Sequence, residues 1–300
     1  MAKIYNIIIP LSFLGLWISS MVSKDIEIFF GFILIFTFGI LHGSNDILLI
    51  DTISNNKKTY PFIRVITTYL LTVFISVFVF YFMPLLALIL FIAFSAFHFG
   101  QQHWEHHNLE VSEILKRIYY FLYGMLILNL LFIFNTTEVI EIVISITNYE
   151  IKNNSIFFLL TVFGVLYLLI ASFIAYKSNS FKSKILIELF YLIVFSIIFK
   201  VSSLIWGFTL YFILWHSIPS LYEQILFIYG NFNSKNLLKY CKTALPYWII
   251  SIIGIVIVYF ILKNEKLFFA IFFSFIAAVT FPHTIVINKL FSNKKTQPNK

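Results

Sequence analysis

The feature that most constrains this chain is a succession of apolar runs, each near the length that a helix needs to cross a lipid bilayer. A helix of roughly 20 residues spans a hydrocarbon core of about 30 Å. Such runs lie at 4–22, 28–50, 65–83, 84–100, 118–134, 155–176, 185–199, 201–218, 245–262 and 267–288. We therefore predict an all-α integral membrane protein, a polytopic helical bundle of about ten spans.

Two of the boundaries between neighbouring runs each depend on a single residue. Pro84 lacks an N–H donor and disfavours helix in the residue before it, so a tight turn is expected there. Lys200 divides the run at 185–199 from the run at 201–218. The count of ten depends on both breaks.

The positions of the basic residues agree with ten spans. Cytoplasmic loops of membrane proteins carry an excess of Lys and Arg. With the N-terminus and the C-terminus both in the cytoplasm, 16 of the 21 basic residues fall in cytoplasmic segments. The outer segments then hold Lys24, Lys152, Lys200, Lys263 and Lys266. The net charge of +8 is thus explained by topology, and we expect no nucleic-acid partner.

Composition supports the same class. Hydrophobic residues make up 60% of the chain and charged residues 11%, against about a quarter charged in soluble domains. The sequence shows no domain boundary and no repeat, so we predict one transmembrane domain over 1–300 with a short basic C-terminal tail at 289–300. Residues 135–150 have the character of a helix at the outer interface. The single cysteine, Cys241, excludes an intrachain disulfide.

Four histidines interrupt apolar spans at one predicted depth. His42 lies toward the end of the second span, His98 ends the fourth, His216 ends the eighth and His283 nears the end of the tenth. All even-numbered spans run from outside to inside, so the four histidines fall near the cytoplasmic end of the bundle. Any one of them alone could be satisfied by a neighbouring hydroxyl or carbonyl. Because ionisable groups in lipid tend to face one another, four at one depth favour a shared metal site.

Asp46 follows His42 by four residues, which places both on one face of a continuous helix. A carboxylate there could accept the second N–H of a metal-bound His42 and fix its orientation. The alternative is a residue at a helix end near lipid headgroups. Imidazole ligands suit iron, copper, nickel or zinc, and the sequence alone does not choose among them.

A second cluster, "HWEHH" at 103–107, places His103, His106 and His107 in an HxxHH box like those of membrane fatty-acid desaturases and hydroxylases. Those enzymes hold two irons with about eight histidines in several boxes, whereas this chain has seven histidines and one box. We interpret 103–107 as a solvated or interfacial loop. A di-iron fatty-acid or carotenoid desaturase or hydroxylase is one alternative function, and a transporter or heme protein without carotenoid chemistry is another.

Four short segments together resemble the Brp/Blh family of membrane β-carotene 15,15′-dioxygenases. They are "LHGSNDILL" (41–49), "SAFHFG" (95–100), "WHSIPS" (215–220) and "FPHTIVI" (281–287), in the family's order and approximate spacing. The resemblance implies that His42, His98 and His216 are iron ligands and that His283 matches a further family histidine. One departure concerns position 220, where we expect many members to carry a second histidine and this chain has Ser220. The fourth ligand is then His283 or a water, or the site has three histidines, and Ser220 lies beside the ligands.

The resemblance also implies a reaction. A non-haem Fe(2+) enzyme of the cell's inner (cytoplasmic) membrane would take β-carotene from the bilayer and cleave its central double bond with O₂, giving two molecules of retinal. A functional link to a microbial rhodopsin follows from the same resemblance. The hydrocarbon offers no hydrogen-bonding group, so specificity should come from the shape of an aromatic tunnel. Its expected lining is Phe97, Phe99, Trp206, Tyr211, Phe212 and Trp215.

Overall fold

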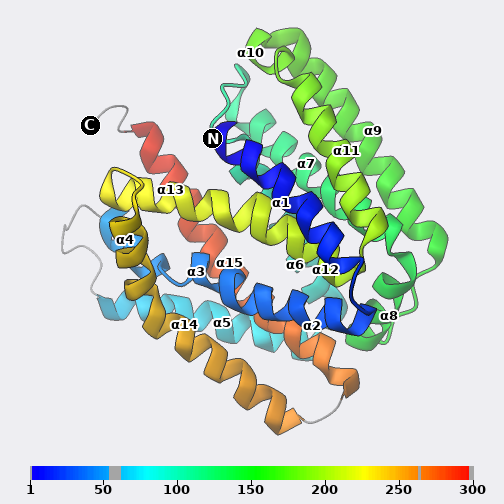
Figure 1. Cartoon of the computed structure of the whole chain (residues 1–300), viewed down its shortest axis with the longest axis vertical. Helices are drawn as coiled ribbons and strands as arrows, with labels where there is room; N and C mark the ends of the chain where they lie inside the picture. Colours follow the sequence, from blue (N-terminus) through cyan, green and yellow to red (C-terminus); the bar gives the residue numbers. More distant parts are fainter. Residues whose placement is uncertain (1, 54–61, 263–264, 297–300) are drawn as a thin grey trace. The chain divides into compact units, whose positions relative to one another are not determined.

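The protein is all-helical over the residues that the structure, a computed structural model, describes: 2–53, 62–262 and 265–296 (Figure 1). No strand occurs within these three ranges. The N-terminal part of the chain forms α1 (Ala2–Ser19), α2 (Lys24–Leu34), the π-helical η1 (Ile35–Gly39), α3 (Ile40–Gly43), α4 (Asp46–Ile53), α5 (Phe62–Phe82) and α6 (Pro84–Trp104).

The middle and C-terminal parts continue in the same way. They form α7 (Glu113–Phe134), α8 (Thr136–Thr147), α9 (Asn153–Lys177), α10 (Asn179–Lys182), α11 (Ile185–Val201), α12 (Leu204–Leu210), the π-helical η2 (Tyr211–Ser217), α13 (Ile218–Tyr229), α14 (Ser234–Leu262) and α15 (Glu265–Thr296). The predicted breaks at Pro84 and near Lys200 are confirmed, because α6 begins at Pro84 and α11 ends at Val201. Proline suits this first helical position, where its missing N–H has no partner to lose.

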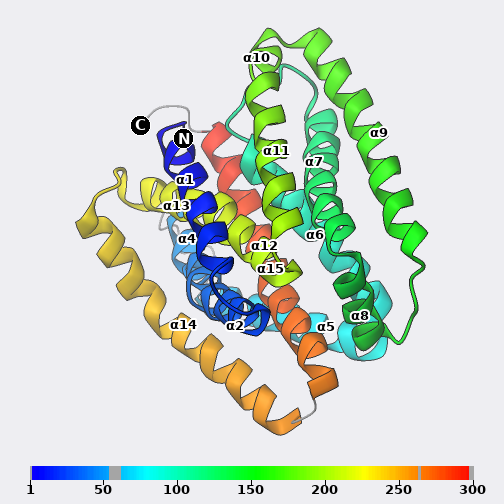
Figure 2. The same ribbon diagram turned by 45° about the vertical axis from the view of Figure 1, so that its right-hand side comes forward.

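Contacts divide the chain into two compact units. The first unit comprises Met1–Ile35, Ile92–Ile144 and Asn148–His216, and the second comprises Phe36–Phe91, Ser145–Thr147 and Ser217–Lys300. In the first unit α7 packs on α9 and α11, and the three helices lie side by side in both ribbon views (Figures 1 and 2). In the second unit α15 packs on α4 and α5, and α14 packs on α3 and α15. The prediction of one domain over 1–300 stays a prediction.

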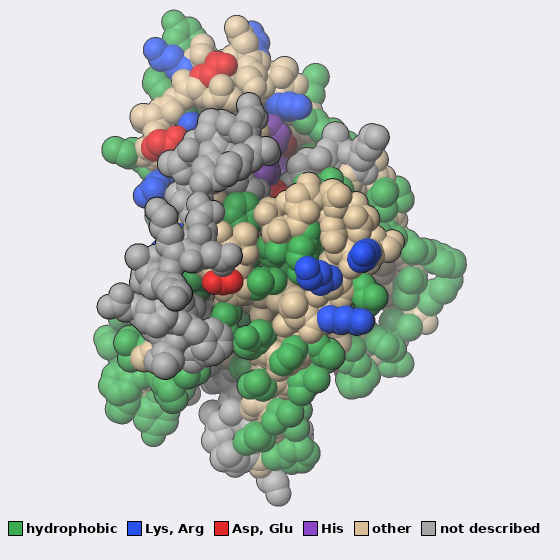
Figure 3. Space-filling view, turned by 90° about the vertical axis from the view of Figure 1, so that its left-hand side faces the viewer, with side chains coloured by type: hydrophobic (Ala, Val, Ile, Leu, Met, Phe, Trp, Pro, Cys, Tyr) green, Lys and Arg blue, Asp and Glu red, His purple; other side chains and the backbone are tan. Residues whose placement is uncertain are grey.

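Within the described ranges, five helical stretches are long and apolar enough to cross a membrane: Lys24–Ile53, Pro84–Trp104, Glu113–Phe134, Asn153–Lys177 and Leu204–Tyr229. Shorter apolar helices lie at Ile4–Ser19, Leu70–Phe82 and Phe275–Phe291. Many large apolar side chains are exposed, and Figure 3 shows broad hydrophobic areas on the face it displays. These features indicate a membrane protein. Ten spans and the cytoplasmic position of both termini stay predictions.

Helices α6 and α7 meet at two glycines of the first unit. A methyl group on Gly100 would lie 1.9 Å from the carbonyl oxygen of Tyr120, and one on Gly124 would lie 1.8 Å from that of Ala96. The two backbones therefore approach closely only because neither position carries a side chain, the small-residue packing common between membrane helices. This contact fixes the part of α6 that carries His98.

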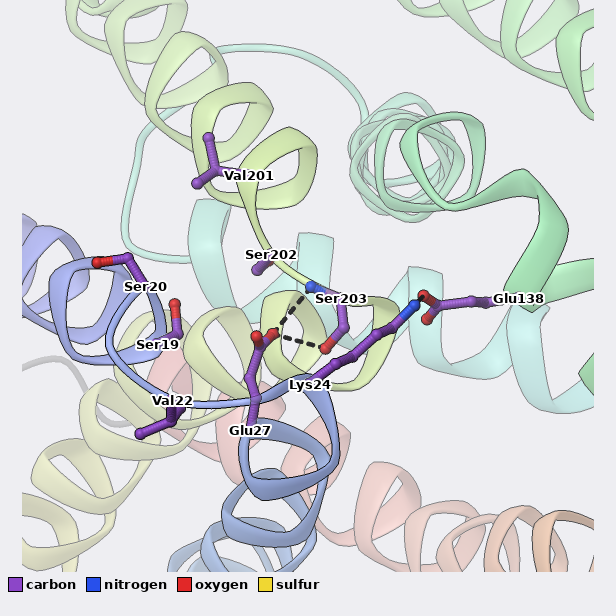
Figure 4. Close-up of a pocket in the computed structure, with 9 residues that line it drawn as sticks. All are labelled: Ser19, Ser20, Val22, Lys24, Glu27, Glu138, Val201, Ser202 and Ser203. Atoms are coloured by element: carbon purple, nitrogen blue, oxygen red, sulfur yellow. Dashed lines mark hydrogen bonds and ion pairs between the residues drawn. The ribbon is translucent and has the colours of Figure 1, made fainter.

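Two carboxylates hold the N-terminus of α12, the helix that leads into η2 and His216 (Figure 4). The Glu27 carboxylate accepts hydrogen bonds from the backbone N–H of Ser203 (2.9 Å) and from its hydroxyl (2.6 Å). Glu138 accepts from the N–H of Leu204 at 2.9 Å and also pairs with Lys24. The first N–H groups of a helix have no partner within it and carry partial positive charge, so both carboxylates stabilise this start. The side chains of Lys24, Glu27, Glu138 and Ser203 line an open polar pocket of the first unit.

The structure differs from the predicted spans in two places. The run at 28–50 is not one continuous helix: it passes through η1, α3 ends at Gly43, and α4 begins at Asp46. The run at 201–218 changes from α12 to the π-helical η2 at Tyr211. Residues 136–147 are helical as predicted, and α15 continues to Thr296 through most of the predicted tail. Residues 297–300 of that tail lie outside the described residues.

Candidate metal centre

The first unit holds two histidines as a close buried pair. His98 lies on α6 and His216 on η2, with exposed fractions of 1% and 2%. Their ring centroids are 4.7 Å apart and the ring planes are 76° apart. Neutral imidazoles each offer one nitrogen lone pair, so this pair can supply two metal donors.

Aromatic side chains surround the ring of His216. Phe99 meets it edge-on with centroids 4.7 Å apart, and Phe212 stacks on it at 5.5 Å and 15°. Phe99 also contacts Tyr211 at 5.5 Å. The pair therefore lies beside an apolar wall rather than in a polar cleft.

The backbone carrying His216 is held from α6. The side-chain amide of Gln102, itself buried, donates a hydrogen bond of 2.9 Å to the carbonyl oxygen of His216. Because η2 is π-helical, its hydrogen-bond ladder differs from that of an α-helix, and such segments occur often at functional sites. Gln102 lies one turn after His98, so the same stretch of α6 carries one histidine and fixes the backbone of the other.

The second unit holds the other two histidines as a similar pair. His42 lies on α3 and His283 on α15, with exposed fractions of 4% and 3% and ring centroids 4.8 Å apart at 89°. A methyl group on Gly43 would lie 3.5 Å from Nδ1 of His283, so the imidazole packs against the backbone of α3. His42 follows η1, and each pair thus includes a histidine in or near a π-helical segment.

Asp46 pairs with His283 and not, as predicted, with His42. Its Oδ1 lies 2.8 Å from Nδ1 of His283, and both side chains are buried. The prediction assumed a continuous helix from His42 to Asp46, whereas α3 ends at Gly43 and a new helix begins at Asp46. A carboxylate that accepts the Nδ1 proton fixes the tautomer and places the lone pair of the imidazole on Nε2. Asp46 therefore orients His283.

Ser220 lies on α13 of the second unit and is buried. Its hydroxyl oxygen is 3.1 Å from Nε2 of Gln224, one turn further along the same helix. Gln224 is in turn 2.6 Å from the hydroxyl of Tyr240, which lies 3.1 Å from the carbonyl oxygen of His42. A hydrogen-bonded chain thus connects position 220 to the backbone of a predicted ligand.

The six predicted tunnel residues all lie in the first unit. Five are buried, and Phe97 is half-buried. The two indoles are tied to α1, since Trp215 donates to the hydroxyl of Ser12 at 3.0 Å and Trp206 donates to the carbonyl of Gly15 at 3.3 Å. Their role in lining a substrate tunnel stays a prediction.

The HxxHH box, predicted as a solvated or interfacial loop, is helical at its start, where one of its histidines contacts a buried carboxylate. His103 lies on the last turn of α6, and its Nε2 is 2.8 Å from Oε2 of the buried Glu188 on α11. Tyr123 stacks on the His103 ring and donates to the same carboxylate oxygen at 3.2 Å. His106 is exposed, and burial lowers the pKa of the half-buried His107. An acidic partner on α11, eighty-five residues away along the chain, draws His103 into the protein.

Three polar residues around the pairs were not predicted: Gln102, Gln224 and Tyr240. All three are buried. Gln102 and Tyr240 are hydrogen-bonded to the backbone of a predicted ligand histidine, and Gln224 is hydrogen-bonded to Tyr240. A signal for Gln102 was present, because polar residues within apolar spans usually bond to a partner or serve a function. Tyr240 offered none, since seventeen tyrosines occur in the chain.

The fold and these buried imidazoles define a helical membrane protein with donor sets suited to a transition metal. The model of the β-carotene 15,15′-dioxygenase family matches residues 33–291, so the chain belongs to that family. The match includes all four histidines and Asp46, and it confirms the predicted resemblance. No curated protein and no solved structure matches the chain. Family membership indicates a carotenoid dioxygenase.

Proposed function

We propose that this protein cleaves the central 15,15′ double bond of β-carotene with O₂ and forms two molecules of all-trans-retinal. The observation that carries the proposal is the occurrence of two pairs of buried histidines within the sequence that matches the family. The desaturase alternative lacks such support, because His103 of its single box is engaged with Glu188.

The proposed metal is Fe(2+), held by His42, His98, His216 and His283. The chemistry of the donor set fits, since imidazole is a good ligand for iron and each pair supplies two nitrogens. Two donors are fewer than the three protein ligands of common non-haem iron sites, so one pair by itself is an incomplete set. When bound, the iron supplies the activation of O₂ that no side chain of the protein provides.

The protein's own residues orient the ligands and bind the hydrocarbon. Asp46 holds the proton on Nδ1 of His283 and so directs Nε2 to the metal. Ser220 lies beside the ligands in the hydrogen-bonded chain and is not itself a ligand. β-Carotene enters from the bilayer, and Phe97, Phe99, Trp206, Tyr211, Phe212 and Trp215 select it by shape. The proposed location is the inner (cytoplasmic) membrane, and a microbial rhodopsin as acceptor of the retinal stays a prediction from the resemblance.

Metal analysis of the purified protein with a visible spectrum tests this proposal. We expect about one iron per chain without a heme band in the wild type, and a large loss of iron in His98→Ala. His106→Ala is the matched control, because that exposed histidine belongs to the HxxHH box alone. Two irons per chain that depend on His106, or a heme band, would contradict the proposal.

A further inference from the structure

The backbone of His42 lies at a break in the second span. Helix α3 ends one residue later, at Gly43, and α4 begins at Asp46. The last carbonyl groups of a helix have no partner within it and are usually satisfied by water or a side chain. His42 belongs to the last turn of α3, in a region where His42, Asn45 and Asp46 are all buried.

A tyrosine from another helix fills this role. Tyr240, on α14, has an exposed fraction of 0%, and its hydroxyl lies 3.1 Å from the carbonyl oxygen of His42. Asn45, in the break itself, donates to the carbonyl of Tyr240 at 2.9 Å. Two hydrogen bonds in opposite directions therefore join the break to one residue of α14.

The hydroxyl of Tyr240 has one proton but faces two oxygens, the carbonyl of His42 and Oε1 of Gln224 at 2.6 Å. The two oxygens share this proton as acceptors. The side-chain amide of Gln224 in turn donates to the hydroxyl oxygen of Ser220 at 3.1 Å. The three side chains therefore form one hydrogen-bonded chain that ends on the backbone of His42.

We propose that Tyr240 is a positioning residue for the metal site, acting on His42 through its backbone carbonyl and supported by Gln224 and Ser220. The inference rests on the proposed function, in which His42 is a ligand. The hydroxyl of Tyr240 contacts the backbone from which the His42 imidazole projects. Fixing this carbonyl sets the position from which the His42 ring meets that of His283. The chain also gives Ser220 a use other than metal ligation.

Tyr240→Phe tests the inference, because it removes the hydroxyl and keeps the buried ring. Tyr119→Phe is the matched control, because that tyrosine is equally buried and its hydroxyl lies 3.4 Å from the hydroxyl of Tyr167. The measurements are iron affinity of the purified full-length protein, from the iron bound at several free Fe(2+) concentrations, and thermal unfolding without metal. Loss of a residue that supports a metal ligand typically lowers metal affinity 10- to 100-fold.

We expect Tyr240→Phe to bind iron at least about tenfold more weakly than Tyr119→Phe, although the two variants unfold at similar temperatures. Gln224→Met should weaken iron binding as well, and the double variant should lose no more than Tyr240→Phe alone, because the residues act in one chain. Equal iron affinity in Tyr240→Phe and Tyr119→Phe, with wild-type protein that binds iron and forms retinal, would overturn this inference alone. Wild-type protein that binds no metal would overturn the proposed function and this inference together.

Discussion

The partner of Asp46 is the main difference between the predicted metal site and the observed one. Its carboxylate lies 2.8 Å from Nδ1 of His283, on a helix that follows it by more than two hundred residues. Asp46→Asn keeps the shape and removes the charge that favours the Nδ1–H tautomer. We expect iron affinity to fall about 10- to 100-fold, measured by iron titration of the purified protein.

The control for this change is Asp51→Asn, an identical substitution at an exposed position of the same helix. It should leave iron affinity unchanged. Equal affinities for the two variants would mean that the carboxylate of Asp46 does not orient a ligand.

At this scale the sequence predicted which residues matter better than it predicted their partners. The four histidines were identified from their depth, and the structure shows each in a buried pair with one of the others. Asp46 was assigned to His42 because the two are four residues apart, but spacing along one helix does not show which distant helix packs across from it. The same limit applies to His103, whose partner Glu188 lies on α11.

Among the elements, the close contact of α6 with α7 allows a specific prediction about the stability of the fold. A methyl group on Gly100 or Gly124 would overlap a backbone carbonyl oxygen of the facing helix. We expect Gly100→Ala and Gly124→Ala each to lower the free energy of unfolding by at least about 2 kcal/mol, because neither backbone can move without opening the contact. Thermal or denaturant unfolding in detergent measures the effect.

Gly164→Ala provides the comparison, since this glycine lies within α9 and no atom is within 4 Å of an added methyl group. Alanine there should raise stability by about 0.5–1 kcal/mol, the usual preference for alanine over glycine inside a helix. If all three substitutions had the same small effect, close packing at Gly100 and Gly124 would not fix α6.

The boundaries of elements were predictable where a residue enforces them and not elsewhere. Pro84 marks the start of α6, and polar residues around Lys200 mark the end of α11. The π-helical segments η1 and η2 lie within largely apolar sequence, "IFTFG" and "YFILWHS". Hydrophobicity alone does not distinguish a π-helical turn from an α-helical one there, so the runs at 28–50 and 201–218 were predicted as unbroken.

For the whole molecule, the sequence predicts a membrane protein because its composition is so strongly apolar. The number of spans is harder to predict, since it depends on helices of marginal length. The distribution of Lys and Arg predicts ten spans with both termini in the cytoplasm. Fusing green fluorescent protein or alkaline phosphatase to the C-terminus tests this. We expect fluorescence and no phosphatase activity, and the same result for fusions within residues 177–184. An even number of spans returns the chain to the side of the membrane where it began. Phosphatase activity of a C-terminal fusion would therefore contradict a cytoplasmic N-terminus followed by ten spans.

Cleavage of β-carotene by the whole protein can be assayed directly in cells. The protein and its His98→Ala variant are expressed in a bacterium that accumulates β-carotene, and the extracted pigments are separated by chromatography. We expect wild-type cells to lose their orange colour and to contain retinal as the sole cleavage product, while cells with the variant at an equal protein level keep β-carotene. Persistence of β-carotene in both, or formation of hydroxylated carotene, would contradict central cleavage at a histidine-held metal.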